Sequence, residues 1–308
     1  MIVVTGEALV DLVIGTDGSV TAKLGGGPYN AARTIGRLGG EVRFMGAVSR
    51  DRFGRELLDH LEADGVDTST VTLTDLPTTL AAAELDESGA ASYRFYLEGT
   101  SAPSLSAVPE AGRAPDAVHA GTLGLVLRPM ADTVLSYLES LPDETLVLLD
   151  PNCRPRVVTD RAWYVGVVER AVRRSHVVKI STDDAEYLSP GLDALDYAHS
   201  LLHLGARAVL LTAGGDGAHA VTAEGHRLIP SRPVEVVDTI GAGDSFGGAF
   251  LQWWLDHHGT GAASIARLGS LDAVAEAVDA AAEVAGHTCS RAGAEPPRRT
   301  DLSPRWHP

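Results

Sequence analysis

Short runs of apolar, often β-branched residues alternate with amphipathic stretches along most of the chain. Each apolar run has the length of one buried strand, and the stretches between them repeat apolar residues every three or four positions, as helices that cover a sheet do. This alternation predicts βαβ units and therefore a mostly parallel sheet with helices on both faces. The predicted strands are residues 2–5, 42–48, 117–120, 146–149, 177–180, 208–212 and 234–237, and the predicted helices are residues 30–38, 53–63, 131–138, 162–173, 192–204 and 245–257.

Residues 70–96 interrupt the alternation. They contain the strand-like segments VTLTD, TTLAAAELD and ASYRFYLE, with polar turns and no helical pattern between them. Together with residues 8–23 they predict a small antiparallel sheet that projects from the main domain. We therefore expect one α/β domain over residues 1–297, with a lid built from about residues 8–23 and 70–98. Residues 298–308 are rich in proline and charge without periodicity and are expected to be loosely ordered.

The composition is that of a globular enzyme and excludes several functions. Of 308 residues, 44% are hydrophobic and 21% are charged, which are ordinary values. A net charge of −16 disfavours nucleic acid and anionic membrane surfaces as partners. No apolar run is long enough to span a bilayer, and Glu7 and Asp11 interrupt the first apolar segment, so a cytoplasmic location is expected. Two cysteines, Cys153 and Cys289, cannot build a disulfide framework.

The strongest candidate for chemistry is VEVVDTIGAGDSFGGAFLQWWL, residues 234–255. A predicted strand leads into Gly241, Ala242, Gly243 and Asp244, and a long amphipathic helix follows. Glycines allow a tight turn, and the N–H groups at the start of the helix would form an anion hole. A phosphoryl group bound there would lie beside the Asp244 carboxylate, which could accept the proton of an attacking hydroxyl.

The same segment permits other interpretations. Asp244 could be only a helix N-cap in a glycine turn. The glycine spacing does not match a dinucleotide-binding fingerprint, and no G-K-[S/T] of a Walker loop occurs. Lysine is scarce, since only Lys23 and Lys179 are present, so any lysine that binds phosphate must be one of these two.

Two motifs resemble signatures of the ribokinase-like (PfkB) carbohydrate kinases. DTIGAGDSFGGAF, residues 238–250, is similar to the C-terminal signature of that family. LGGGPYNAARTIGRLGGEVRFMGAVSRDRFG, residues 24–54, is similar to its N-terminal signature, and the resemblance continues to about Pro297. The resemblance implies a ribokinase-like αβα sandwich with a β-sheet lid, and ATP-dependent phosphorylation of a sugar primary hydroxyl.

The resemblance also implies roles for particular residues. Sugar binding would fall to Asp11, Gly26, Gly27 and Asn30, although a turn residue and a helix N-cap are alternative roles for Asp11 and Asn30. The D-P-N-x-R motif at residues 150–154 is similar to the fructokinase and 2-keto-3-deoxygluconate kinase branch. It makes Asn152 and Arg154 candidates to contact the transferred phosphate.

Nucleotide and metal positions follow in the same way. The nucleotide positions implied are Ser181, Thr212, Gly214 and Gly217. Asp184 would act on Mg²⁺ through water, with Asp183 and Glu186 as alternatives, because the family's usual glutamate is replaced here. Asp238 would help to hold a monovalent cation such as K⁺, although Ile240 stands where relatives carry a side-chain oxygen.

On the lid, Arg94 and Tyr96 are candidates to contact the sugar, and in relatives the lid often forms a homodimer. We expect fructose to be the sugar, because the G-E-A-L-V-D, D-P-N-C-R-P and V-K-I-S segments are most similar to fructokinases. The alternatives are a 2-keto-3-deoxygluconate kinase, in which Arg94 would clamp the carboxylate, and a non-catalytic sugar-binding protein on the same fold.

Overall fold

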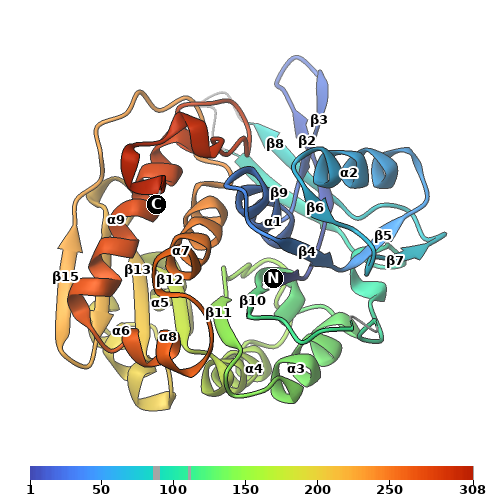
Figure 1. Cartoon of the computed structure of the whole chain (residues 1–308). Coiled ribbons are helices and arrows are strands. Elements are labelled where there is room, and N and C mark those ends of the chain that lie inside the picture. The colour runs from blue at the N-terminus through green and yellow to red at the C-terminus, as the bar shows by residue number, and fades with distance from the viewer. Residues whose placement is uncertain (86–90, 110–111, 308) are drawn as a thin grey trace.

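A computed structural model describes residues 1–85, 91–109 and 112–307 of the chain. Within these ranges nine strands form one large sheet, in which β14 is antiparallel to both of its neighbours, β13 and β15, and all other neighbouring strands are parallel. The predicted mostly parallel α/β fold is therefore confirmed (Figure 1). The order across the sheet is β15 (Gly225–Ile229), β14 (Ala218–Thr222), β13 (Ala208–Thr212), β12 (Val177–Ser181), β11 (Leu146–Asp150), β10 (Ala117–Gly121), β1 (Ile2–Thr5), β4 (Val42–Met45) and β6 (Val66–Asp67).

Helices cover both faces of this sheet. Alternate residues of each strand point to opposite faces, so that Val4 packs with one set of helices and Val3 with the other. One face holds α1 (Gly27–Arg37), α2 (Arg52–Ala63), α7 (Ala242–His258), α8 (Gly261–Arg267) and α9 (Leu271–Cys289); the other holds α3 (Met130–Ser140), α4 (Arg161–Arg174), α5 (Thr182–Leu188) and α6 (Ala194–Leu204).

The lid is a second sheet in the order β3 (Val20–Gly25), β2 (Leu9–Ile14), β8 (Leu80–Leu85) and β9 (Ala91–Tyr96). It is antiparallel at β2–β3 and β8–β9, whereas β2 and β8 run parallel. They do so because both strands enter the lid from the main domain at the same edge, where Val10 donates to the Thr79 carbonyl. The VTLTD segment does not join the lid: β7 (Thr72–Thr74) pairs with β5 (Ala47–Ser49).

Two other expectations differ from the structure. Residues 234–237 are not a strand but an extended segment, in which Val237 donates to the Cys289 carbonyl at the end of α9. Among the described residues β15 is the last strand on that side of the sheet, and residues 234–237 do not pair with it. Residues 299–306 form two 3₁₀ turns (Arg299–Asp301 and Pro304–Trp306), and Trp306 is buried against the core, so this segment is packed rather than loose.

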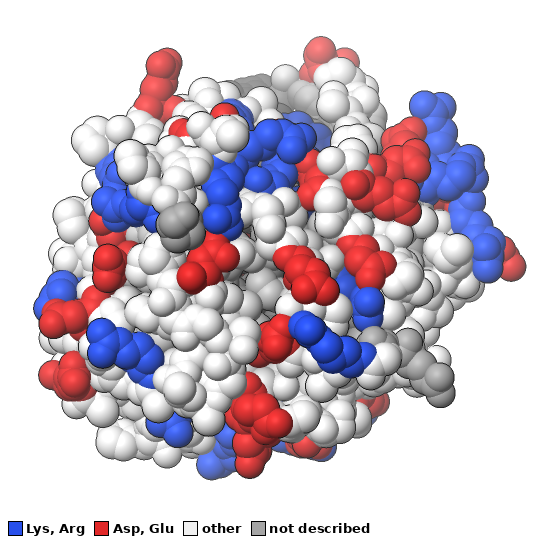
Figure 2. Space-filling view, viewed as in Figure 1, with Lys and Arg blue, Asp and Glu red and all other residues white. Residues whose placement is uncertain are grey.

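Charged side chains of both signs lie on the surface (Figure 2). Acidic and basic side chains are interspersed on the face shown in Figure 2 rather than gathered into one basic surface. Within the described ranges, none of the helices is long and apolar enough to cross a membrane.

Candidate active site

The α7 N-terminus opens into a cavity of about 560 Å³ between the main domain and the lid. Gly241 precedes the helix with φ 75°, in the left-handed region that glycine adopts at little cost. A Cβ at Gly241 would also lie 2.5 Å from Ala294 Cβ. The turn therefore needs glycine for two reasons, and it brings the positive end of the helix to the cavity wall.

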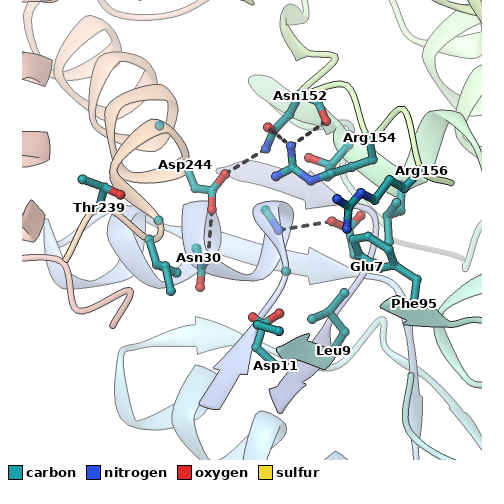
Figure 3. A pocket seen from close by; sticks show the side chains of 18 of the residues that line it. Glu7, Leu9, Asp11, Asn30, Phe95, Asn152, Arg154, Arg156, Thr239 and Asp244 are labelled. Carbon is teal, nitrogen blue, oxygen red and sulfur yellow. Dashed lines mark hydrogen bonds between the residues drawn. The ribbon is translucent and has the colours of Figure 1, made fainter. Parts of the chain in front are cut away.

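Asp244 lies in the first turn of α7 but does not cap the helix, because Gly241 occupies the N-cap position and no side chain caps it. Its carboxylate is nearly buried and points into the cavity (Figure 3). Oδ2 accepts from Asn30 Nδ2 at 2.9 Å, and Oδ1 accepts from Asn152 Nδ2 at 3.3 Å. The interpretation of Asp244 as a simple helix cap therefore does not hold.

Arg154 reaches this carboxylate through Asn152. Arg154 Nη1 donates to Asn152 Oδ1 at 2.6 Å, and both residues line the cavity. Asn152 has φ 40°, a conformation that few residues other than glycine adopt and that asparagine tolerates best. The loop after β11 is thus held in a strained shape that aims one amide at Asp244 and one guanidinium at the cavity.

Four of the predicted sugar-binding residues lie around the cavity that the Asp244 carboxylate enters. Asp11 on β2, together with Gly26, Gly27 and Asn30 at the start of α1, lines the same cavity. Burial raises the pKa of Asp11 to about 6, and the nearby Arg154 guanidinium acts in the opposite direction. Paired carboxylate and amide groups of this kind suit the hydroxyls of a sugar.

The two candidates on β9 are not brought to the cavity. Phe95 lines it, and because side chains alternate along a strand, Arg94 and Tyr96 lie on the other face of the lid. Arg94 is exposed, and Tyr96 is 52% exposed. The structure therefore does not place either side chain in the cavity, and their role as substrate contacts stays a prediction. The basic side chains that line the cavity beside Phe95 are Arg154 and Arg156.

A buried ion pair lies beneath the anion hole. Lys179 Nζ on β12 is 3.0 Å from Asp150 Oδ2 on β11, and both side chains are almost fully buried. A Cβ at Gly243 would lie 3.0 Å from Lys179 Nζ, so the ammonium group sits directly against the turn that leads into α7. Burial raises the pKa of Asp150 to about 7, while the adjacent ammonium group acts in the opposite direction.

The predicted nucleotide residues lie together but outside this cavity. Ser181 and Thr212 are register partners at the C-terminal ends of β12 and β13, and Gly214 and Gly217 follow β13 directly. Ligands of open α/β sheets collect at this edge.

Asp184 is close by, but its carboxylate is already engaged. It accepts hydrogen bonds from the backbone N–H groups of Cys153 and Ser181 and from the Ser181 hydroxyl. The bonds with Ser181 belong to a capping box at the start of α5, and the bond from Cys153 ties the loop after β11 to it. Asp184 therefore holds the loop after β11 against the N-terminus of α5.

Asp238 is similarly engaged. Its carboxylate accepts from the N–H groups of Ile240 and Gly293, and Lys23 Nζ on β3 of the lid lies 3.4 Å away. These backbone bonds lower the pKa of Asp238 against the effect of its partial burial. An ammonium group therefore faces the position where the resemblance implies a monovalent cation.

Several cavity residues were not predicted from sequence. Lys179 was one of two candidates for a phosphate-binding lysine and equally a strand-end lysine, and nothing in the pattern indicated that Glu7 or Arg156 would line the cavity. A polar residue that directly follows a buried strand is the one signal that could have indicated Glu7, because strand ends meet at one edge of the sheet.

The fold and the site define a sugar kinase, and comparison with known proteins agrees. A model of the pfkB family of carbohydrate kinases matches residues 1–301, so the chain belongs to this family and is an ATP-dependent carbohydrate kinase. The chain is 35% identical over 260 residues to a fructokinase from Rhizobium leguminosarum bv. trifolii, over 82% of this chain and 78% of that protein.

Solved structures show the same architecture. A fructokinase from Xylella fastidiosa with bound ATP superimposes with a TM-score of 0.85 and 25% identity, over 95% of this chain and 93% of that one. Aminoimidazole riboside kinase from Salmonella enterica, in complex with aminoimidazole riboside and an ATP analogue, superimposes with a TM-score of 0.80 and 26% identity, over 95% of this chain and 94% of that one.

Proposed function

We propose that this kinase transfers the terminal phosphoryl group of ATP to a primary hydroxyl of fructose. The observation that supports this best is the Asp244 carboxylate, which is held by two amides at the open end of α7 instead of capping the helix. The proposal of fructose as the sugar is supported by the relatives of this chain that are named fructokinases.

The chemistry follows from the arrangement around Asp244. Each carboxylate oxygen accepts one amide hydrogen bond and keeps further lone pairs, so the group can orient the attacking hydroxyl and accept its proton. The α7 N-terminus and the Arg154 guanidinium supply positive charge where the migrating phosphoryl group gathers negative charge. Lys179 adds charge from below the turn.

ATP would bind along the edge formed by Ser181, Thr212, Gly214 and Gly217, with its phosphates toward Gly243. The exposed side chains of Val236 and Val237, 60% and 59% exposed, lie just before the anion hole in sequence and would offer an apolar surface to the base. Phe95 and the lid would cover the sugar and limit wasteful hydrolysis by excluding water.

Mg²⁺ would accompany ATP and neutralise phosphate charge. No group of three acidic, histidine or cysteine side chains among the described residues is placed to enclose a metal. This suits an ion that is held mainly by phosphates and water. Asp184 would reach it only through water, with Asp183 and Glu186 exposed on the same helix.

A panel of acceptor sugars tests the proposal. We expect fructose to give the highest kcat/KM with ATP among fructose, tagatose, ribose, aminoimidazole riboside and 2-keto-3-deoxygluconate. The keto acid is the main rival, because Arg154 and Arg156 line the cavity and could clamp a carboxylate. A tenfold preference for the keto acid that Arg156→Met removes, while the control Arg94→Met keeps it, would contradict the fructose proposal.

Potassium should stimulate this kinase only weakly. The Lys23 ammonium group already faces Asp238, and Ile240 offers no side-chain oxygen. We expect rates in potassium, sodium and choline chloride at equal ionic strength to agree within about twofold. A much larger rate in potassium chloride would show that a cation site forms despite Lys23.

We also propose that the outer face of the lid mediates a homodimer. Tyr96 and Val20 are exposed on the lid, at 52% and 59%, and an open sheet face with such groups favours association. Light scattering should give twice the mass of the chain for the wild type and a lower mass for Tyr96→Asp.

A further inference from the structure

Glu7 is a buried acidic side chain in the cavity that the proposed mechanism does not use. It follows β1, is only 1% exposed, and lines the cavity beside Arg154 and Phe95 (Figure 3). Glutamate is rarely buried to this extent without a full set of hydrogen-bond partners. An acid in such a position therefore requires an explanation.

One oxygen of the Glu7 carboxyl group has a structural role. Oε1 accepts a hydrogen bond from the backbone N–H of Gly27 at 3.1 Å, which satisfies one of the free donors at the start of α1. Oε2 has no partner among the described residues, although it is buried. The bond to Gly27 thus accounts for one oxygen only, and a buried polar atom left without a partner commonly marks the place of a bound molecule.

The surroundings of Oε2 indicate what it would bind. Burial raises the pKa of Glu7 to about 8; the hydrogen bonds of its own N–H and that of Gly27 and the charge of Arg154 lower it, and Asp244 raises it. The Glu7 carboxyl group therefore keeps its proton at neutral pH. Since Oε1 is the acceptor for Gly27, Oε2 is free to present an O–H group. A neutral O–H group can donate to a sugar hydroxyl without adding a second negative charge near Asp244.

We propose that Glu7 Oε2 hydrogen-bonds to one hydroxyl of the acceptor sugar other than the hydroxyl that is phosphorylated, and so makes Glu7 a specificity residue. The phosphorylated hydroxyl must lie at Asp244, and Glu7 lies on the other side of the first turn of α1, as Figure 3 shows. Glu7 and Asp244 would thus hold different hydroxyls of one sugar. This inference rests on the proposed sugar kinase activity.

Two substitutions separate this role from a structural one. Glu7→Gln keeps an acceptor for Gly27 and places an amide donor where Oε2 lies. Glu7→Met has a similar length and removes both hydrogen bonds. Glu283→Met is a control for the loss of a buried glutamate outside the cavity, where Glu283 accepts hydrogen bonds from Ser303.

The experiment measures the Kd for fructose by calorimetry without nucleotide, and then for each monodeoxy fructose. We expect Glu7→Met to bind fructose at least tenfold more weakly than wild type, since a buried polar partner is lost. Glu7→Gln and Glu283→Met should stay within about threefold. One deoxy analogue should bind wild type and Glu7→Met equally weakly, because the hydrogen bond is already missing in both.

Equal fructose affinity in wild type and Glu7→Met would overturn the inference. A loss that is the same for fructose and every deoxy analogue would also overturn it, because Glu7 would then act through shape alone. If the wild type binds a different sugar of the panel, the fructose assignment fails, and the same deoxy series on that sugar still decides the role of Glu7.

Discussion

The Asp244 carboxylate is positioned by residues from distant parts of the chain. Asn30 comes from α1 and Asn152 from the loop after β11. A buried charge is tolerated only when it is hydrogen-bonded, and here the same bonds fix the orientation of the group. The left-handed backbone of Asn152 costs on the order of 1 kcal/mol, so some stability is given up for this placement.

Asp244→Asn should lower kcat by about 10²–10⁴-fold, because it removes the proton acceptor. The new amide group must turn its NH₂ toward Asn30 or Asn152, both of which are donors, so we also expect a loss of about 1 kcal/mol in the free energy of unfolding. Steady-state kinetics and denaturant titration measure the two effects. More than a tenth of the wild-type kcat would contradict the role of Asp244.

Glu7→Gln should stabilise the enzyme increasingly as the pH rises from 5 to 8. The pKa of Glu7 is raised from 4.5 in the unfolded chain to about 8 in the folded protein by burial. Between these values the unfolded chain releases the proton and the folded protein retains it, so the stability of the wild type falls by up to about 1.4 kcal/mol per pH unit. The Glu7→Gln variant lacks this contribution to the pH dependence of stability. Parallel Tm curves for the two proteins would contradict a raised pKa.

At the scale of elements, the anion hole depends on the chain segment that follows α9. Ala294 packs against Gly241, and its carbonyl accepts from Arg33 on α1. Arg33 and Asp64 form a buried pair at 2.8 Å, each with only 4% of its side chain exposed, and Glu295 joins them at 3.1 Å. This network ties α1 and the end of α2 to the segment that packs on Gly241.

Arg33→Met should lower the free energy of unfolding by about 3 kcal/mol, because it leaves the buried Asp64 with an incomplete set of partners. Arg52→Met is the matched control: Arg52 pairs with Glu56 on the surface and is 85% exposed, so its removal should cost less than about 0.5 kcal/mol. Denaturant unfolding of both variants measures the difference. Equal losses of unfolding free energy in the two variants would show that the buried network does not stabilise the protein.

At the scale of the whole molecule, the sequence predicted the parts that local periodicity determines. The parallel strands, most helices and the lid follow from the alternation of apolar and polar positions, and the glycine turn with Asp244 followed from its motif. Confirmation of the family supports these assignments.

Features that depend on neighbours far away in the chain were not predictable in this way. The segment around Val236 has strand-like residues but no strand beside it. Alternation along the strand predicts that the Arg94 and Phe95 side chains point to opposite faces of the lid. It does not predict which of the two faces lines the cavity. The place of Glu7 depended on α1, twenty residues later in the chain.

Trp306→Ala should destabilise the protein by about 3–5 kcal/mol, because the indole is 1% exposed and packs against the core. His307→Ala is the control, since that side chain is exposed. Thermal unfolding of the two variants measures the effect. A Trp306→Ala protein as stable as the control would show that the final residues are as loose as their composition suggests.

One wall of the cavity is the lid sheet and the other belongs to the main domain, and this has a consequence for how such an enzyme diverges. Val13, Ala83 and Phe95 belong to the lid, whereas Asp244 and Arg154 belong to the main domain. Replacements in the lid wall can accumulate after gene duplication, and change which acceptor fits, without disturbing Asp244 and Arg154. A laboratory library confined to those lid positions should therefore yield new acceptor preferences at nearly unchanged ATP affinity.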